Sequence, residues 1–128
     1  MKFPTLLLWV NCAMFVVFGA CFIVAPEFFA IVITGATPGT PSAFTDMRAT
    51  YGGMGFGIGL LFGFCARRAS TVRIGLIASL LVLGATAVAR LIGIFSDGSS
   101  NLFMFLLLFA ELLFVALIVA ALRQSRNE

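Results

Sequence analysis

The composition of this 128-residue chain is that of a membrane protein. Apolar residues make up 62% of it and charged residues only 10%, whereas soluble domains average about 45–50% apolar and 25% charged. The apolar fraction amounts to roughly 79 residues, and four membrane-spanning helices of about 20 residues each need ~80. A soluble enzyme, a nucleic-acid-binding protein, a disordered tail and a disulfide scaffold are therefore poorly compatible with the sequence.

Four apolar runs predict an all-α fold, an antiparallel bundle of four transmembrane helices that forms one domain over residues 1–128. We expect these helices at about residues 5–25, 44–65, 71–93 and 101–122. After the first run, the segment 27–34 (EFFAIVIT) is too short to span a membrane and predicts an interfacial helix or a re-entrant segment. The Gly/Pro-rich segment 35–42 that follows it predicts a loop.

The net charge of +3 is distributed as in a membrane protein. Its basic residues lie before the first run, between the second and third runs, and after the fourth. They are Lys2, Arg67, Arg68, Arg73, Arg123 and Arg126. Because connections that remain in the cytoplasm are enriched in Lys and Arg, we expect both termini and the middle connection on the cytoplasmic side. The same distribution predicts no nucleic-acid partner, since no water-facing basic surface is expected.

Glycines dominate the second predicted helix. One face carries Gly52, Gly55, Gly59 and Gly63. Such a face lets another helix approach closely, within the chain or in a homo-oligomer, although it could also form a smooth pathway for a ligand. The third predicted helix carries the small residues Ala85, Ala89 and Gly93 at the same spacing, which indicates a partner surface.

Apart from Asp46 and Arg73, which lie within the first three residues of their spans, the charged residues inside the predicted spans are Arg48, Arg90 and Glu111. A charge at membrane depth is costly and is usually buried against protein. Glu111 must therefore pair with an arginine or lose its charge. We expect a polar cluster in the outer half, in which Arg90 or Arg48 reaches Glu111 and Tyr51 adds a hydroxyl group. Asp46 and Glu27 would balance the second arginine.

Three interpretations of this cluster are open. Buried ion pairs can fix helix register and topology. Two arginines around a cavity can bind a small anionic or amphipathic molecule. Glu111 can also act as a catalytic or proton-relay carboxyl group.

Other reactive side chains are few. The chain has no histidine, and its three cysteines lie inside apolar runs without CxxC spacing. We therefore predict no metal site, no cofactor and no disulfide bond. Asn11, inside the first predicted helix, is expected to form an interhelical hydrogen bond.

The stretch from Phe44 to Met54, FTDMRATYGGM, resembles the signature of a bacterial family of small four-helix membrane proteins, "domain of unknown function 4345". The resemblance continues through the basic connection, the Ala89-Arg90 pair and Glu111. It implies a polytopic inner-membrane protein and supplies no reaction, substrate or partner.

These observations favour a non-catalytic membrane protein that binds a lipid-like molecule or a partner helix. Arg48, Arg90 and Glu111 would form its polar anchor. A small proton-coupled transporter is the alternative. An intramembrane isomerase or hydrolase that uses Glu111 with Tyr51 is a third class, which the lack of histidine disfavours.

Overall fold

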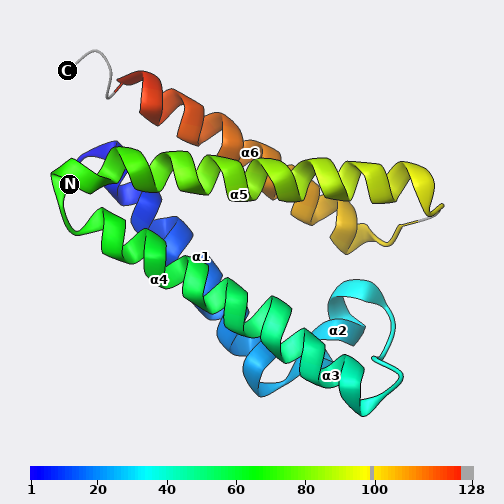
Figure 1. Cartoon of the computed structure of the whole chain (residues 1–128). Coiled ribbons are helices and arrows are strands. Elements are labelled where there is room, and N and C mark those ends of the chain that lie inside the picture. Colours follow the sequence, from blue (N-terminus) through cyan, green and yellow to red (C-terminus); the bar gives the residue numbers. More distant parts are fainter. Residues whose placement is uncertain (99, 125–128) are drawn as a thin grey trace.

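The computed structural model of the chain describes residues 1–98 and 100–124 (Figure 1). Arg126, one of the basic residues after the fourth apolar run, lies outside the described residues. The described part is all-α, as predicted, and contains no strand. Four of its helices are long and apolar enough to cross a membrane.

The described residues form five helical segments. They are α1 (Phe3–Val24), α2 (Pro26–Thr34), a continuous helix over Pro41–Ala66, α5 (Ala69–Ser96) and α6 (Leu102–Gln124). The continuous helix consists of α3 (Pro41–Met47), the π-helical segment η1 (Arg48–Met54) and α4 (Gly55–Ala66). The short segment expected after the first span is helix α2.

Local sequence explains where these helices begin and end. Pro26 ends α1, because proline has no N–H group to continue the hydrogen-bond ladder, and it starts α2 as that helix's first residue. Gly35 ends α2 in the left-handed conformation, with φ 79°. Thr40 caps α3, because its Oγ1 accepts a hydrogen bond of 3.2 Å from the backbone N–H of Ala43.

The four long helices are arranged as two pairs, α1 with the helix Pro41–Ala66 and α5 with α6 (Figure 1). The pairs meet at the end that holds the chain start and the α4–α5 turn. We call this the basic end, because it carries Lys2, Arg67, Arg68, Arg73 and Arg123. The pairs diverge towards the loop end, which holds α2, residues 35–40 and the α5–α6 turn.

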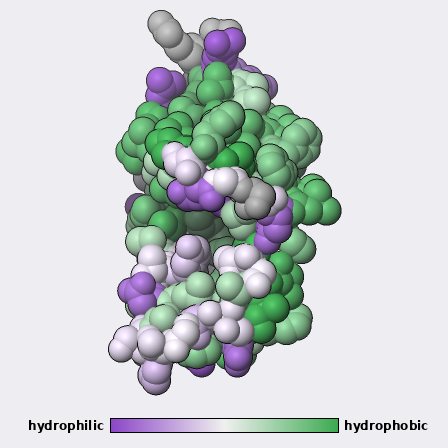
Figure 2. All heavy atoms as spheres, turned by 90° about the vertical axis from the view of Figure 1, so that its right-hand side faces the viewer, coloured by the Kyte–Doolittle hydropathy of each residue, from purple (hydrophilic) through white to green (hydrophobic). Residues whose placement is uncertain are grey.

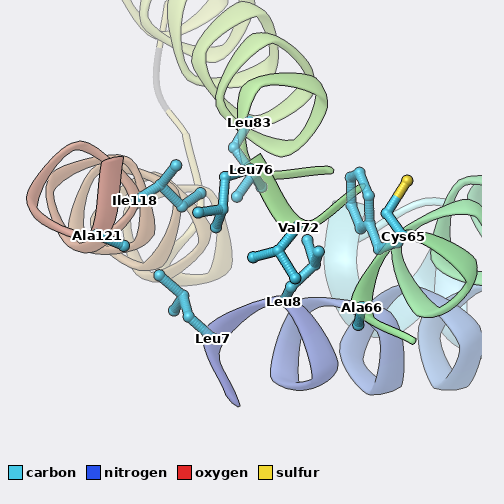
Figure 3. Close-up of a cluster of buried hydrophobic side chains, with 10 residues drawn as sticks. Leu7, Leu8, Cys65, Ala66, Val72, Leu76, Leu83, Ile118 and Ala121 are labelled. Atoms are coloured by element: carbon cyan, nitrogen blue, oxygen red, sulfur yellow. The ribbon is translucent and has the colours of Figure 1, made fainter. Parts of the chain in front are cut away.

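The hydrophobic core lies at the basic end (Figure 3). Leu8, Val72, Leu76 and Ile118 are buried there, together with residues from α4. Gly75 allows the close crossing of the two pairs, since a Cβ atom on it would lie 2.5 Å from Leu8 Cδ2 and 2.6 Å from Cys65 Cβ. The helices therefore pack as a bundle at the basic end and not along their whole length.

At the loop end, Figure 2 shows a recess between the α5–α6 turn and the polar α2–α3 connection. Asn101 Nδ2 donates a hydrogen bond of 2.8 Å to the carbonyl oxygen of Ile33 in α2, which links the two sides of this end. The same asparagine caps α6, because its Oδ1 accepts from the N–H of Met104 (3.1 Å).

Candidate functional site

Arg90 and Glu111 form an ion pair between α5 and α6. Arg90 Nη2 lies 2.6 Å from Glu111 Oε1, and Nε lies 3.1 Å and 3.0 Å from the two carboxylate oxygens. The side chains are 19% and 10% exposed. Arg90 Nη1 also contacts the sulfur of Met104 at 3.3 Å. Bidentate pairs of this kind are both strong and directional, so this contact fixes the two helices in one register.

The helical repeat explains why these two residues meet. Arg90 follows the buried Leu83 by seven residues, and Glu111 precedes the buried Ile118 by seven. A spacing of seven returns a side chain to the same helix face. Because α5 and α6 are antiparallel, the step from Leu83 to Arg90 and the step from Ile118 back to Glu111 both lead towards the loop end. The ion pair thus takes the place of one apolar layer in the α5–α6 seam.

Arg48 lies on the other helix pair, at the start of η1. Its Nη1 group donates a hydrogen bond to the carbonyl oxygen of Ile23 in the last turn of α1. Pro26 interrupts the helix just beyond, so carbonyl groups of this turn lack helical donors, and a cation is favourable at a helix C-terminus. Within the described residues, no carboxylate lies within 4.0 Å of the Arg48 guanidinium group.

Tyr51 and Asp46 are both exposed. The Tyr51 ring is 49% exposed and stacks on Phe22 of α1, with ring centroids 5.2 Å apart. An oxygen of Asp46 lies 3.4 Å from the Thr50 hydroxyl group one turn later. Both side chains belong to the continuous helix Pro41–Ala66, on the opposite pair from Glu111.

Of the residues expected in one polar cluster, the structure brings together Arg90 and Glu111. It joins Arg48 to α1, and it gives Tyr51 and Asp46 neighbours within the α1 pair. The question of which arginine reaches Glu111 is therefore answered by Arg90. A ligand-binding role for these residues stays a prediction.

The predicted packing glycines line the contact between α1 and the helix Pro41–Ala66. A Cβ atom on Gly59 would lie 2.7 Å from the Val16 nitrogen, and one on Gly52 would lie 2.7 Å from Ile23 Cγ1. Gly63 faces the Cys12 sulfur in the same way, while Gly55 is further from α1, with its nearest atom, Gly19 Cα, at 3.8 Å. The glycine face is therefore a contact surface between two helices of the same chain.

One expectation about the partner of this face differs from the structure. Ala85 and Ala89 of α5 are exposed, so the glycine face is covered by α1 and not by these alanines. A homo-oligomer formed through the second span stays a prediction. It would have to use the opposite face, at Gly57, where no atom would lie within 4 Å of an added Cβ.

The sequence arguments missed three features of the site. Met104 was not expected to contact Arg90, although it precedes Glu111 by seven residues and so lies on the same face. Gly19 was not identified as the partner of the glycine face, although a Cβ atom on it would lie 2.4 Å from the backbone nitrogen of Phe56. Asn11 donates to the carbonyl oxygen of Leu7 in its own helix (2.9 Å), where an interhelical bond was expected.

Metal binding finds no support in the described part of the chain, where no three His, Cys, Asp or Glu side chains gather as ligands. The three cysteines are free thiols: Cys12 and Cys21 are half-buried and Cys65 is buried.

Comparison with known proteins identifies the family. No curated protein and no solved structure matches the chain. The family model described as "Domain of unknown function (DUF4345)" matches residues 4–122, which include all four long helices almost completely. The chain is therefore a membrane protein that belongs to the DUF4345 family.

Proposed function

We propose that this protein binds an anionic, lipid-like molecule at its loop end and that Arg48 contacts the anionic headgroup. The observation that carries the proposal is the difference between the two arginines inside the spans. The charge of Arg90 is neutralised by Glu111, whereas Arg48 has only the Ile23 carbonyl group as a partner in the described contacts. A cation at membrane depth without a carboxylate attracts an anion.

The surroundings of Arg48 suit an amphipathic ligand. The two helix pairs diverge at this end, and apolar side chains such as Val24 and Phe28 are exposed there. A shallow apolar groove of about 280 Å³ lies along the last turns of α1 and the start of α2, lined by Ala20, Cys21, Val24, Ala25 and Phe29. An acyl chain could rest in this groove while its headgroup reaches Arg48.

Native mass spectrometry of the purified protein tests this proposal. We expect wild-type protein to bind phosphatidylglycerol in preference to phosphatidylcholine, and Arg48→Gln to lose about tenfold in that preference, since it removes a charge-assisted hydrogen bond. Arg73→Gln is the matched control, because Arg73 is an exposed cation at the opposite end. Equal lipid binding by the wild type and Arg48→Gln would contradict the proposal.

Proton-coupled transport and catalysis by Glu111 have less support. Both need Glu111 to exchange a proton, whereas both of its oxygens accept hydrogen bonds from Arg90. If proton-coupled flux into liposomes were present and disappeared in Glu111→Gln, transport would replace headgroup binding as the better proposal.

We also propose that the protein lies in a bacterial inner membrane with both termini in the cytoplasm. Apart from Arg48, its exposed basic residues in the described part of the chain gather at the basic end, whereas Glu27, Asp46 and Asp97 belong to the loop end. This asymmetry supports a cytoplasmic basic end by the positive-inside rule.

A further inference from the structure

Two polar side chains inside the bundle are completely buried, and each has an oxygen atom without a hydrogen-bond partner among the described residues. Asn11 of α1 and Ser79 of α5 are both 0% exposed. The Asn11 amide nitrogen donates to Leu7, but its Oδ1 atom accepts no hydrogen bond, and Ser79 Oγ forms none either. Buried polar atoms are nearly always hydrogen-bonded to protein or water, so these two orphans require an explanation.

The helical repeat predicts that the two residues lie at the same level of the contact between α1 and α5. Both helices start at the basic end (Figure 1), and they touch where Gly75 meets the side chain of Leu8. Asn11 follows Leu8 by three residues and Ser79 follows Gly75 by four. Each is therefore one turn further along and on the same helix face as the contact.

We propose that a single water molecule binds between these side chains and bridges Asn11 Oδ1 to Ser79 Oγ. Asn11 Oδ1 can only accept a hydrogen bond, and water can donate one to it. The serine hydroxyl group can donate to the same water or accept from it. A buried water molecule needs at least two polar partners, and these two side chains supply them. Two neutral partners surrounded by apolar side chains are too few to hold an ion.

This water links the helix pair that contains α1 to the helix pair that contains α5, at the end where the two pairs meet. The core around it consists of apolar side chains, which pack without direction. A hydrogen-bonded bridge between α1 and α5 adds the directional contact that sets their relative register.

A double-mutant cycle on thermal stability tests whether the two groups act together. Asn11→Leu and Ser79→Ala should each lower the melting temperature in a native-like membrane mimic, because each leaves the other group without its bridge. In the Ser79→Ala background, Asn11→Leu should cost about 3 °C less than it does in the wild type, since no orphan remains. Additive effects would overturn the proposal.

Thr86→Ala is the matched control for the cycle. Thr86 lies two turns further along α5, is exposed and bonds to the Val82 carbonyl group of its own helix. Its effect should be additive with that of Asn11→Leu. Coupling as large as that of Ser79→Ala would show that the cycle reports general destabilisation, and the proposal would fail.

A crystal structure from a lipid phase that resolves ordered waters identifies the bridging group. We expect one water peak within roughly 2.6–3.2 Å of both oxygen atoms. A direct hydrogen bond from Ser79 Oγ to Asn11 Oδ1, or a serine hydroxyl group bonded to a carbonyl of its own helix, would overturn the proposal even if the cycle shows coupling.

Discussion

At the scale of single residues, the two intramembrane arginines, Arg48 and Arg90, have different roles because only Arg90 is paired with a carboxylate. Arg90 and Glu111 neutralise each other inside the α5–α6 seam, so the pair presents little net charge to its surroundings. Arg48 instead satisfies a carbonyl group at the end of α1 and keeps an uncompensated charge. The pair is therefore suited to fixing helix register, and Arg48 to attracting an anion.

The Arg90–Glu111 pair predicts a specific pattern of stability. Glu111→Leu alone should destabilise the protein by roughly 3 kcal/mol, because it leaves a partly buried guanidinium group without its partner. Arg90→Leu combined with Glu111→Leu should recover most of this loss, since two leucines extend the apolar seam of Leu83 and Ile118. Unfolding of the purified protein in detergent mixtures measures both values.

The doubly substituted protein serves as the internal control, because it changes the same sites without leaving a lone charge. If Glu111→Leu unfolds at the same denaturant concentration as the wild type, the pair does not contribute to stability. The polar contact would then have to be explained by ligand binding or proton transfer instead.

The sequence predicted that Glu111 needs an arginine, but it left two arginines to choose from. The spacing of seven residues from Leu83 to Arg90, and from Glu111 to Ile118, carries the answer once α5 and α6 are known to pack together. The contact between α5 and α6 is a feature of the tertiary structure. Apolar residues surround every helix of a membrane protein, so hydrophobic periodicity does not show which faces touch.

At the scale of helices, the glycines of the second span are a contact surface for α1. The added Cβ atoms at Gly52 and Gly59 would meet backbone or branched side-chain atoms of α1, and backbone atoms cannot move aside. Gly19 makes the contact mutual, because a Cβ atom on it would lie 2.4 Å from the Phe56 nitrogen in α4 and 2.7 Å from the Gly52 oxygen in η1. Packing of this kind is the main force that holds helices together in lipid.

Two alanine substitutions in the same helix should therefore have opposite effects. Gly59→Ala should lower the melting temperature, because its Cβ would lie 2.7 Å from the Val16 nitrogen and 3.0 Å from the Cys12 carbonyl oxygen. Gly57→Ala should be neutral or stabilising by up to about 1 kcal/mol, since nothing lies within 4 Å and alanine favours helix. Thermal unfolding in one detergent compares them directly, and equal effects would mean that α1 does not pack on this face.

Composition predicts the four long helices but not the π-helical segment η1. Four apolar runs of spanning length predict four long helices, because a spanning backbone must satisfy its own hydrogen bonds. The π-helical turns of η1 were not predicted. They lie at the Tyr51-Gly52-Gly53 stretch, where Tyr51 stacks on Phe22 and Gly52 touches Ile23, so they depend on contacts with a distant helix.

At the scale of the whole molecule, polar groups and packing are distributed unequally between the two ends. The basic end carries the buried core and most exposed cations of the described residues, whereas the loop end carries Glu27, Asp46 and Asp97 and is where the helix pairs diverge. The difference in charge between the two ends predicts how the protein is oriented in the membrane. The difference in packing predicts which end opens more easily.

Accessibility labelling tests the proposed orientation. In a variant whose three native cysteines are replaced by alanine, Gly39→Cys places a thiol at the loop end and Ser70→Cys places one at the basic end. A membrane-impermeant maleimide added to intact bacterial cells should label only Gly39→Cys, and Ser70→Cys should react after permeabilisation. The reverse pattern would place the basic end outside and contradict the positive-inside argument.

The packing difference predicts that the loop end opens more easily than the basic end. Asn101 supplies the hydrogen bond that links the α5–α6 turn to α2 in the described structure. Asn101→Asp keeps the oxygen that caps α6 but removes the nitrogen that donates to Ile33, so it separates these two roles. We expect it to widen the loop end without loss of helix.

Pulsed electron spin resonance measures this opening between labels at Phe28 and Phe95, which are 61% and 83% exposed on the two sides of the loop end. In Asn101→Asp, the distance distribution should broaden towards longer values, while circular dichroism stays unchanged. A second label pair, at Lys2 and Arg67, should keep its wild-type distribution, because the core holds the basic end. If the Phe28–Phe95 distribution does not change, contacts other than Asn101 hold the pairs together and the divergence is rigid. If it broadens, the hydrogen bond controls access to the recess beside α2, and anionic lipid should exchange faster from the variant than from the wild type.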